Sequence, residues 1–416
     1  MKHAEILLVM LFFSLGIARG NDKEPVMMGM SRANITPEEP VLMSGYEARK
    51  TPSTGVHDEL FATAFCFSDQ TSRVMLITSD VIGFSHQFND EIVRDISEAT
   101  GMGVDQIMLT AAHNHGAPSI RTYTENAPPE NERYIQSLRE KLVKISIEAS
   151  ENLQPVKMGI GKGFCSMNIN RRAKFADGGV WLGRNQDGPC DHEVTILKIE
   201  DMEGKLLALH VNWPCHGTTN GQENYQITGD WPGATARYLE KHLGNDIVIG
   251  ITDGASGDIN PIYGPGDNFR EIDAMGANLG EEVLKVLPGI ETLPAFGLNT
   301  MQQTIHLPGK QPCETHFPQE EYEAGPDVEI RLAAVRVGNI VFEGISGELM
   351  NEIGMQLKAN SPFSGTVVIT HCNGSSGYIC TDEAYMEGGY EVKVTRLMPG
   401  VEEEIVHQFA DMVNQL

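Results

Sequence analysis

Residues 109–118 read Leu-Thr-Ala-Ala-His-Asn-His-Gly-Ala-Pro, an apolar segment that runs into two histidines and then stops at glycine and proline. Residues two apart on a strand face the same side, so His113 and His115 are expected to project together from the end of a strand. Sites in α/β sheets gather at such strand ends. Taken alone, the pair is compatible with a metal site or with a structural role.

Short apolar runs alternate with amphipathic stretches on both sides of this segment. The predicted strands are 60–67, 73–78, 106–111, 194–199, 206–213, 247–251, 333–342 and 366–369. The predicted helices are 89–99, 130–151, 232–243, 272–287, 348–359 and 401–413. This alternation predicts an α/β fold, with helices packed on mixed β-sheets in a single large domain. The stretch 306–327 is rich in Pro, Gly and Glu and is predicted to be a surface loop.

The first twenty residues have the pattern of a secretory signal peptide. Lys2 and His3 precede an apolar run over 6–17, and Ala18-Arg19-Gly20 offers small residues at the exit. That run is shorter than the roughly 20 residues a spanning helix needs. The mature chain, 21–416, has no comparable apolar stretch, so a secreted or periplasmic protein without a transmembrane segment is expected.

Composition excludes one class of partner. The 416 residues include 31 basic and 57 acidic side chains, for a net charge of -26. A surface this acidic repels nucleic acid at long range. The seven cysteines are odd in number and irregularly spaced, so they do not describe a disulfide framework, and their pairing stays open.

Three further segments carry residues suited to chemistry. In 206–217 an apolar strand breaks at Pro214 and presents His216 beside a glycine, whereas His210 lies inside the strand and is expected to be a core residue. In 340–348 an apolar strand precedes Ser346, which is expected to cap a helix whose first turn holds Glu348.

The loop 252–261 follows another apolar strand and holds two glycines and two aspartates. It lacks the Gly-Lys-Ser/Thr of a phosphate loop and the G-x-S-x-G of a nucleophile elbow, so it is interpreted as a tight polar turn. Two histidines and a carboxylate at strand ends form a ligand set that leaves a position open for water on zinc, which favours metal-assisted hydrolysis. The same set also suits Fe(II) or Mn(II).

Taken in order, these segments resemble the catalytic domain of the neutral (non-lysosomal) ceramidases. The resemblance is collinear over nearly the whole mature chain, and the segments that carry it are 29–37, 43–46, 78–80, 112–118, 167–171, 214–216, 228–230, 257–261, 344–348, 372–378, 383–385 and 388–391.

The resemblance implies one zinc ion bound by His113, His216, Glu348 and Tyr378. It further implies that His115 lies beside the metal, against substrate or the reacting water, and that Arg171 lies near the active site. The implied substrate is a small-molecule or lipid amide, with ceramide as the family's sphingolipid substrate; nothing in the sequence indicates a protein partner.

Two departures from the family pattern bear on activity. The family has a serine before the proline of the glycine-rich loop, where this chain has Asn260, which cannot form an acyl-enzyme. Zinc-bound water is then the expected nucleophile, with Asn260 hydrogen-bonding the substrate or an oxyanion; Ser256 could replace the serine only in a differently folded loop.

The chain also ends at Leu416, where ceramidases continue into an immunoglobulin-like domain, and its segment 298–327 is shorter than theirs. Three hypotheses therefore stand: a ceramidase-like hydrolase, a hydrolase of another amide or ester such as an N-acyl sugar, or a non-catalytic binding protein on the same fold.

Overall fold

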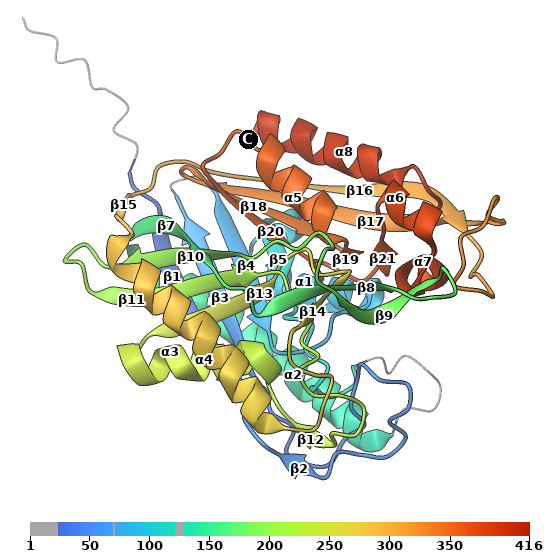
Figure 1. The fold of residues 1–416 in the computed structure, drawn as a ribbon. Helices are drawn as coiled ribbons and strands as arrows, with labels where there is room; N and C mark the ends of the chain where they lie inside the picture. Colours follow the sequence, from blue (N-terminus) through green and yellow to red (C-terminus); the bar gives the residue numbers. More distant parts are fainter. Residues whose placement is uncertain (1–23, 70, 121–127) are drawn as a thin grey trace, which may run out of the picture.

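The computed structural model describes residues 24–69, 71–120 and 128–416, so the predicted signal peptide lies outside the described residues. Three larger sheets, each covered on one face by helices, pack their other faces around a shared apolar core (Figure 1). Each sheet is mixed, because it contains one parallel pair of strands among antiparallel neighbours. The predicted α/β fold of mixed sheets packed with helices is confirmed.

The first sheet has the strand order β5-β4-β3-β1-β6. Its strands are β1 (Met27–Asn34), β3 (Phe61–Ser68), β4 (Arg73–Ser79), β5 (Ile107–Leu109) and β6 (Gln154–Pro155). Helices α1 (His86–Thr100) and α2 (Pro129–Glu151) pack on it. Side chains alternate along β3, so Ala62, Ala64 and Cys66 face these helices. Phe65 and Phe67 face the shared core.

Helix α1 shows how the local sequence sets an element's limits. Ser85 caps its N-terminus by accepting a hydrogen bond from the backbone N–H of Phe88, and Gly101 ends it in the left-handed conformation. Between these caps, Phe88, Ile92 and Ile96 form the apolar stripe that is buried against the sheet.

The second sheet has the order β13-β11-β10-β7-β15. Its strands are β7 (Lys157–Phe164), β10 (Glu193–Glu200), β11 (Leu206–Trp213), β13 (Val248–Asp253) and β15 (Leu293–Pro294). Helices α3 (Asp230–Leu243) and α4 (Phe269–Val286) cover it, and its residues Ile196, Leu209 and Val211 share a core cluster with them.

The third sheet has the order β16-β17-β18-β20 and is covered by α5 (Asn351–Asn360) and α8 (Val401–Gln415). Its strands are β16 (Leu298–Lys310), β17 (Ala324–Val337), β18 (Ile340–Ile345) and β20 (Gly365–Ile369). The single strand predicted over 333–342 is wrong, because Gly338 adopts a φ of 62° and turns the chain into an antiparallel hairpin. The surface loop predicted over 306–327 is also too long, since β16 and β17 extend into it from both sides.

The remaining elements are short. They are β2 (Gly55–Val56), β8 (Asn168–Lys174), β9 (Val180–Asn185), β12 (Gln226–Ile227), β14 (Ile259–Pro261), β19 (Glu348–Leu349), β21 (Tyr378–Ile379), α6 (Asp382–Glu387), α7 (Tyr390–Val394) and two 3-10 turns, Val104–Gln106 and Leu287–Gly289. Among the helices that the structure describes, none combines the length and the apolar character that a membrane crossing requires.

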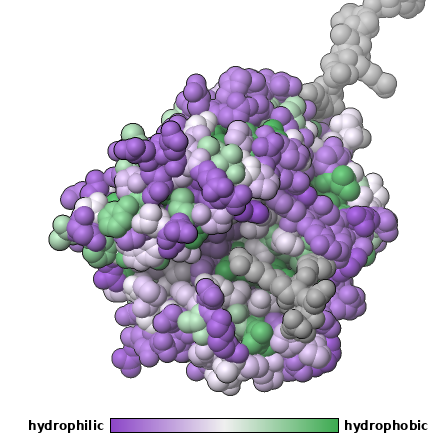
Figure 2. All heavy atoms as spheres, turned by 90° about the vertical axis from the view of Figure 1, so that its right-hand side faces the viewer, coloured by the Kyte–Doolittle hydropathy of each residue, from purple (hydrophilic) through white to green (hydrophobic). Residues whose placement is uncertain are grey.

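Residues of the candidate site follow the three parallel pairs of strands. These pairs are β4 with β5, β11 with β13, and β18 with β20, and each pair is followed in the chain by residues of the site described below. Figure 2 shows one face of the molecule, which is mostly hydrophilic and is hollowed near its centre. Strand ends that converge on one region are the usual location of a site in sheets of this kind.

Candidate metal centre

His113 lies in the loop after β5 rather than on the strand, which ends at Leu109. Its backbone adopts a φ of 52°, a conformation that is rare for a residue other than glycine and often marks a functional site. Its Nδ1 lies 2.9 Å from the carbonyl oxygen of Ile82, so Nδ1 carries the proton and donates it there. The lone pair is therefore on Nε2, the atom that faces the other site residues.

His216 follows β11 and has the same arrangement. Its Nδ1 lies 2.7 Å from the carbonyl oxygen of Ser256, which again leaves the lone pair on Nε2. Ser256 is held by its hydroxyl, which donates to Asp253 Oδ2 at 2.5 Å. Ser256 is buried on the Nδ1 side of His216.

Glu348 is the site's carboxylate, and its predicted position in the first turn of a helix is wrong. It lies in β19, which pairs in parallel with β21, so that Glu348 stands opposite Tyr378; helix α5 begins three residues later. Ser346 accepts a hydrogen bond from the backbone N–H of Arg331 and caps no helix. A tertiary pairing has overridden the local capping pattern.

The carboxylate points at both imidazoles. Glu348 Oε2 lies 3.5 Å from His113 Nε2 and 3.3 Å from His216 Nε2. Both Glu348 Oε2 and His216 Nε2 are buried and have no hydrogen-bond partner among the described residues. Two buried lone-pair atoms this close repel each other unless a cation lies between them, so the donor set fits a bound metal ion.

The protonation states also suit a metal. Burial lowers the pKa of His216 well below its ordinary value, so the ring is neutral. Burial alone would raise the pKa of Glu348, but His113, His371 and a hydrogen bond from Tyr378 hold it below its ordinary value. A neutral imidazole and an ionised carboxylate are the forms that bind metal.

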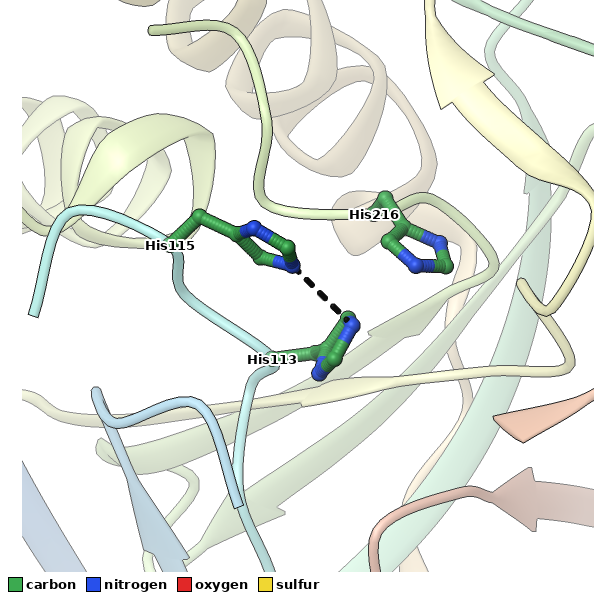
Figure 3. Close-up of side chains that lie close together, drawn as sticks. All are labelled: His113, His115 and His216. Atoms are coloured by element: carbon green, nitrogen blue, oxygen red, sulfur yellow. Dashed lines mark hydrogen bonds between the residues drawn. The ribbon is translucent and has the colours of Figure 1, made fainter. Parts of the chain in front are cut away.

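His115 lies at the edge of this cluster, and Figure 3 shows its ring directed at His113. The two Nε2 atoms are 3.2 Å apart, and His115 Nδ1 is buried without a partner among the described residues. The sequence prediction that His113 and His115 project together is confirmed, although a loop and not a strand presents them. Gly45, with a φ of 90°, makes room for His115, since a Cβ there would lie 2.4 Å from its Nδ1.

Arg171 links the other predicted residues. It lies on β8, and it donates from Nη2 to the Tyr378 hydroxyl at 3.0 Å and from Nη1 to Asn260 Oδ1 at 3.2 Å. Its Nε donates to Glu391 at 2.8 Å. Burial opposes the charged form of Arg171, but Tyr378 and Glu391 hold its pKa above the ordinary value. The Asn260 side chain thus belongs to the same network as Tyr378.

His371 is a site residue that the sequence analysis missed. It follows β20, its ring stacks on His113 with centroids 3.9 Å apart, and its Nε2 is buried with no hydrogen-bond partner among the described residues. His113, Glu348 and His371 form one group of potential metal ligands, and His113, His115 and His216 form another. The pattern that drew attention to His216, an apolar strand that ends in histidine, is also present at His371.

Two other sequence expectations concern buried groups. His210 is a core residue as predicted, since its Nε2 lies 3.1 Å from Thr252 Oγ1 and burial lowers its pKa to about 3. The seven cysteines all lie within the described ranges, none is in a disulfide, and five are buried.

A family model described as "Neutral/alkaline non-lysosomal ceramidase, N-terminal" matches residues 26–269, more than half of the chain. Among curated proteins, neutral ceramidase A of Dictyostelium discoideum is 24% identical over 233 residues, 53% of this chain and 33% of that protein. The neutral ceramidase of Pseudomonas aeruginosa is 24% identical over 290 residues, 64% of this chain and 43% of that protein.

The crystal structure of the Pseudomonas aeruginosa neutral ceramidase aligns with a TM-score of 0.78 and 19% identity, covering 94% of this chain and 74% of that one. That likeness shows a shared fold. The chain aligns with less than half the length of these curated relatives. On the family model and its extent, the chain belongs to the neutral/alkaline non-lysosomal ceramidase family.

Proposed function

We propose that this protein is a secreted, zinc-dependent hydrolase of an amide bond in an N-acyl substrate of the ceramide class. The observation that carries the proposal is the 3.3 Å approach of His216 Nε2 to Glu348 Oε2, two buried atoms that both offer lone pairs. The proposed ligands are His113, His216, Glu348 and Tyr378. Zinc bound there would supply Lewis acidity and a water of lowered pKa.

Tyr378 joins the proposed ligand set through Glu348 and Arg171. Its hydroxyl is hydrogen-bonded to Glu348 and accepts a hydrogen bond from Arg171 Nη2. Burial raises the pKa of Tyr378 well above its ordinary value, while the positive charge of Arg171 opposes this rise. A cation at the site would add to the effect of Arg171 and favour the phenolate.

His115 is the proposed general base. Burial lowers its pKa well below the ordinary value, so its ring is neutral and can accept a proton. Its Nε2 lies 3.2 Å from His113 Nε2, at the edge of the proposed metal position. Its Nδ1 has no partner among the described residues and is the ring nitrogen left to accept a proton when Nε2 donates to His113.

Asn260 is proposed to bind the oxygen on which negative charge develops. Because Arg171 donates to Asn260 Oδ1, the amide is oriented with its NH2 group free to donate elsewhere. An amide donor of this kind stabilises an oxyanion by hydrogen bonding. No covalent acyl-enzyme is formed at this position, since an amide side chain is not a nucleophile.

The experiment is hydrolysis of a ceramide, a set of short N-acyl amines and an N-acyl sugar by the zinc-loaded protein, with His115→Gln for comparison. Turnover of ceramide or another linear N-acyl amine, reduced at least 10²-fold in the variant, is expected from the loss of a general base. Preference for the N-acyl sugar would assign a different amide substrate. Zinc binding without turnover of any substrate would contradict the hydrolase proposal and favour a binding protein.

A further inference from the structure

His371 is neither one of the proposed metal ligands nor the proposed general base. It lies directly after β20 with a φ of 52°, and it is 3% exposed. Its Nε2 has no hydrogen-bond partner within the described part of the chain. A buried polar atom without a partner is destabilising, so its retention calls for an explanation in terms of a ligand.

A shared metal ion does not supply that explanation. The rings of His371 and His113 are stacked, with planes only 11° apart and centroids separated by 3.9 Å. An imidazole binds a metal along the lone pair in its own plane, and two stacked, nearly parallel rings have lone pairs in separate planes. One ion therefore cannot lie in both planes, and His371 adds a polar edge beside the metal position.

His371 lines a cavity of about 370 Å³ together with His113 and Glu348. The apolar part of the wall comes from Ile82, Phe84 and Ile120. His115 and Asn260, proposed above as general base and oxyanion donor, are not among the residues that line it. The rest of the wall is mostly polar, so the cavity has apolar surface for the hydrocarbon of an acyl group and polar groups, His371 among them, close to the proposed metal position.

We propose that His371 hydrogen-bonds a hydroxyl on the acyl group, on the carbon next to the scissile carbonyl, and so selects 2-hydroxyacyl amides over plain acyl amides. This inference rests on the proposed function. His371 stacks on a proposed zinc ligand, which places its Nε2 close to the reacting carbonyl rather than at the far end of the acyl chain. A site with a buried polar atom discriminates against a ligand that lacks the matching group.

The first test compares kcat/KM for a 2-hydroxyoctanoyl amide and the matched octanoyl amide. The wild type is expected to prefer the hydroxylated substrate by about tenfold, the value of one hydrogen bond. His371→Leu should reduce this ratio to near one, and His371→Gln, which keeps a polar edge, should restore part of it. Ser375→Ala, which alters a neighbouring residue of the same cavity, should leave the ratio unchanged.

Three results would overturn the inference. An unchanged ratio in His371→Leu would mean that the hydroxyl is recognised elsewhere, by the metal for example. Collapse of the ratio in Ser375→Ala instead would assign it to that serine. Loss of zinc from His371→Leu and His371→Gln, measured by elemental analysis, would mean that His371 acts by holding the metal.

A binding measurement separates this inference from the proposed function, because it needs no turnover. Calorimetry with the zinc-loaded protein should show 2-hydroxyoctanoate binding about tenfold more tightly than octanoate, with the difference lost in His371→Leu. That result in a protein without amide turnover would leave the inference standing and contradict the hydrolase. Equal affinities in the wild type would overturn the inference, even in an active hydrolase.

Discussion

His216 Nε2 lies 3.3 Å from Glu348 Oε2, although neither atom carries a proton that the other could accept. The proton of His216 is fixed on Nδ1 by the carbonyl of Ser256, and the carboxyl of Glu348 has a pKa below its ordinary value. Strand ends from two different sheets bring these atoms together. Two such atoms fit the proposed metal site, and the predictions below follow from this arrangement and from the charged groups packed around it.

Asn260→Ala is predicted to lower kcat by about 10²- to 10³-fold, the range measured when one oxyanion donor is removed. The metal should stay bound, because Asn260 contacts Arg171 and is not among the proposed ligands. Steady-state kinetics with elemental analysis of the same sample tests both statements. A burst of acyl-enzyme in the wild type would contradict the assignment, since it would require a nucleophilic side chain.

Glu391→Gln is predicted to destabilise the fold by about 3–5 kcal/mol, the range for breaking a buried ion pair from one side. Glu391 is 1% exposed and accepts from Arg171 at 2.8 Å and Arg172 at 2.9 Å, so both guanidinium groups would lose a charged partner. Urea unfolding of the variant measures the loss. Glu403→Gln, at an exposed position on α8, is the matched control and should change stability little; equal effects of the two would contradict the account.

The buried carboxyl of Glu343 is expected to make the free energy of unfolding depend on pH. It is buried on β18, and burial raises its pKa from 4.5 to about 8. Between these two values the folded protein keeps a proton that the unfolded chain has released, so stability is lost as pH rises through this window. Glu343→Gln removes the group that titrates.

The variant should therefore be more stable than the wild type, by a margin that grows from pH 5 to pH 8 by up to about 1.4 kcal/mol per pH unit. Urea unfolding of both proteins at pH 5.5 and pH 8 measures the margin. A margin that is constant with pH would mean that Glu343 is ionised in the folded protein.

Local sequence patterns predicted much of the fold. The strand predicted over 206–213 coincides with β11, because a mostly apolar run is followed directly by a proline that ends it. Helix α2 was predicted to within one residue, since Pro129 begins it and its apolar stripe is regular. Residues adjacent in the sequence determine where these elements begin and end.

The errors occurred where distant residues decide the structure. Glu348 was expected in a helix, and pairing with Tyr378, thirty residues away, holds it in a strand instead. Tyr378 itself carries no local signal and was found through the family resemblance alone. His371 did carry the signal used for His216, and its place on the His113 ring depends on how two sheets meet, which no single segment indicates.

The most direct test of the central claim is the metal content of the purified protein by elemental analysis, in the wild type, in His216→Ala and in His242→Ala. His242 is a histidine outside the site, at the end of α3, and serves as the control. The account predicts about one zinc per chain in the wild type and the control, and a loss of most of it in His216→Ala. Equal zinc in all three proteins, or none in the wild type after reconstitution with zinc, would contradict the metal centre.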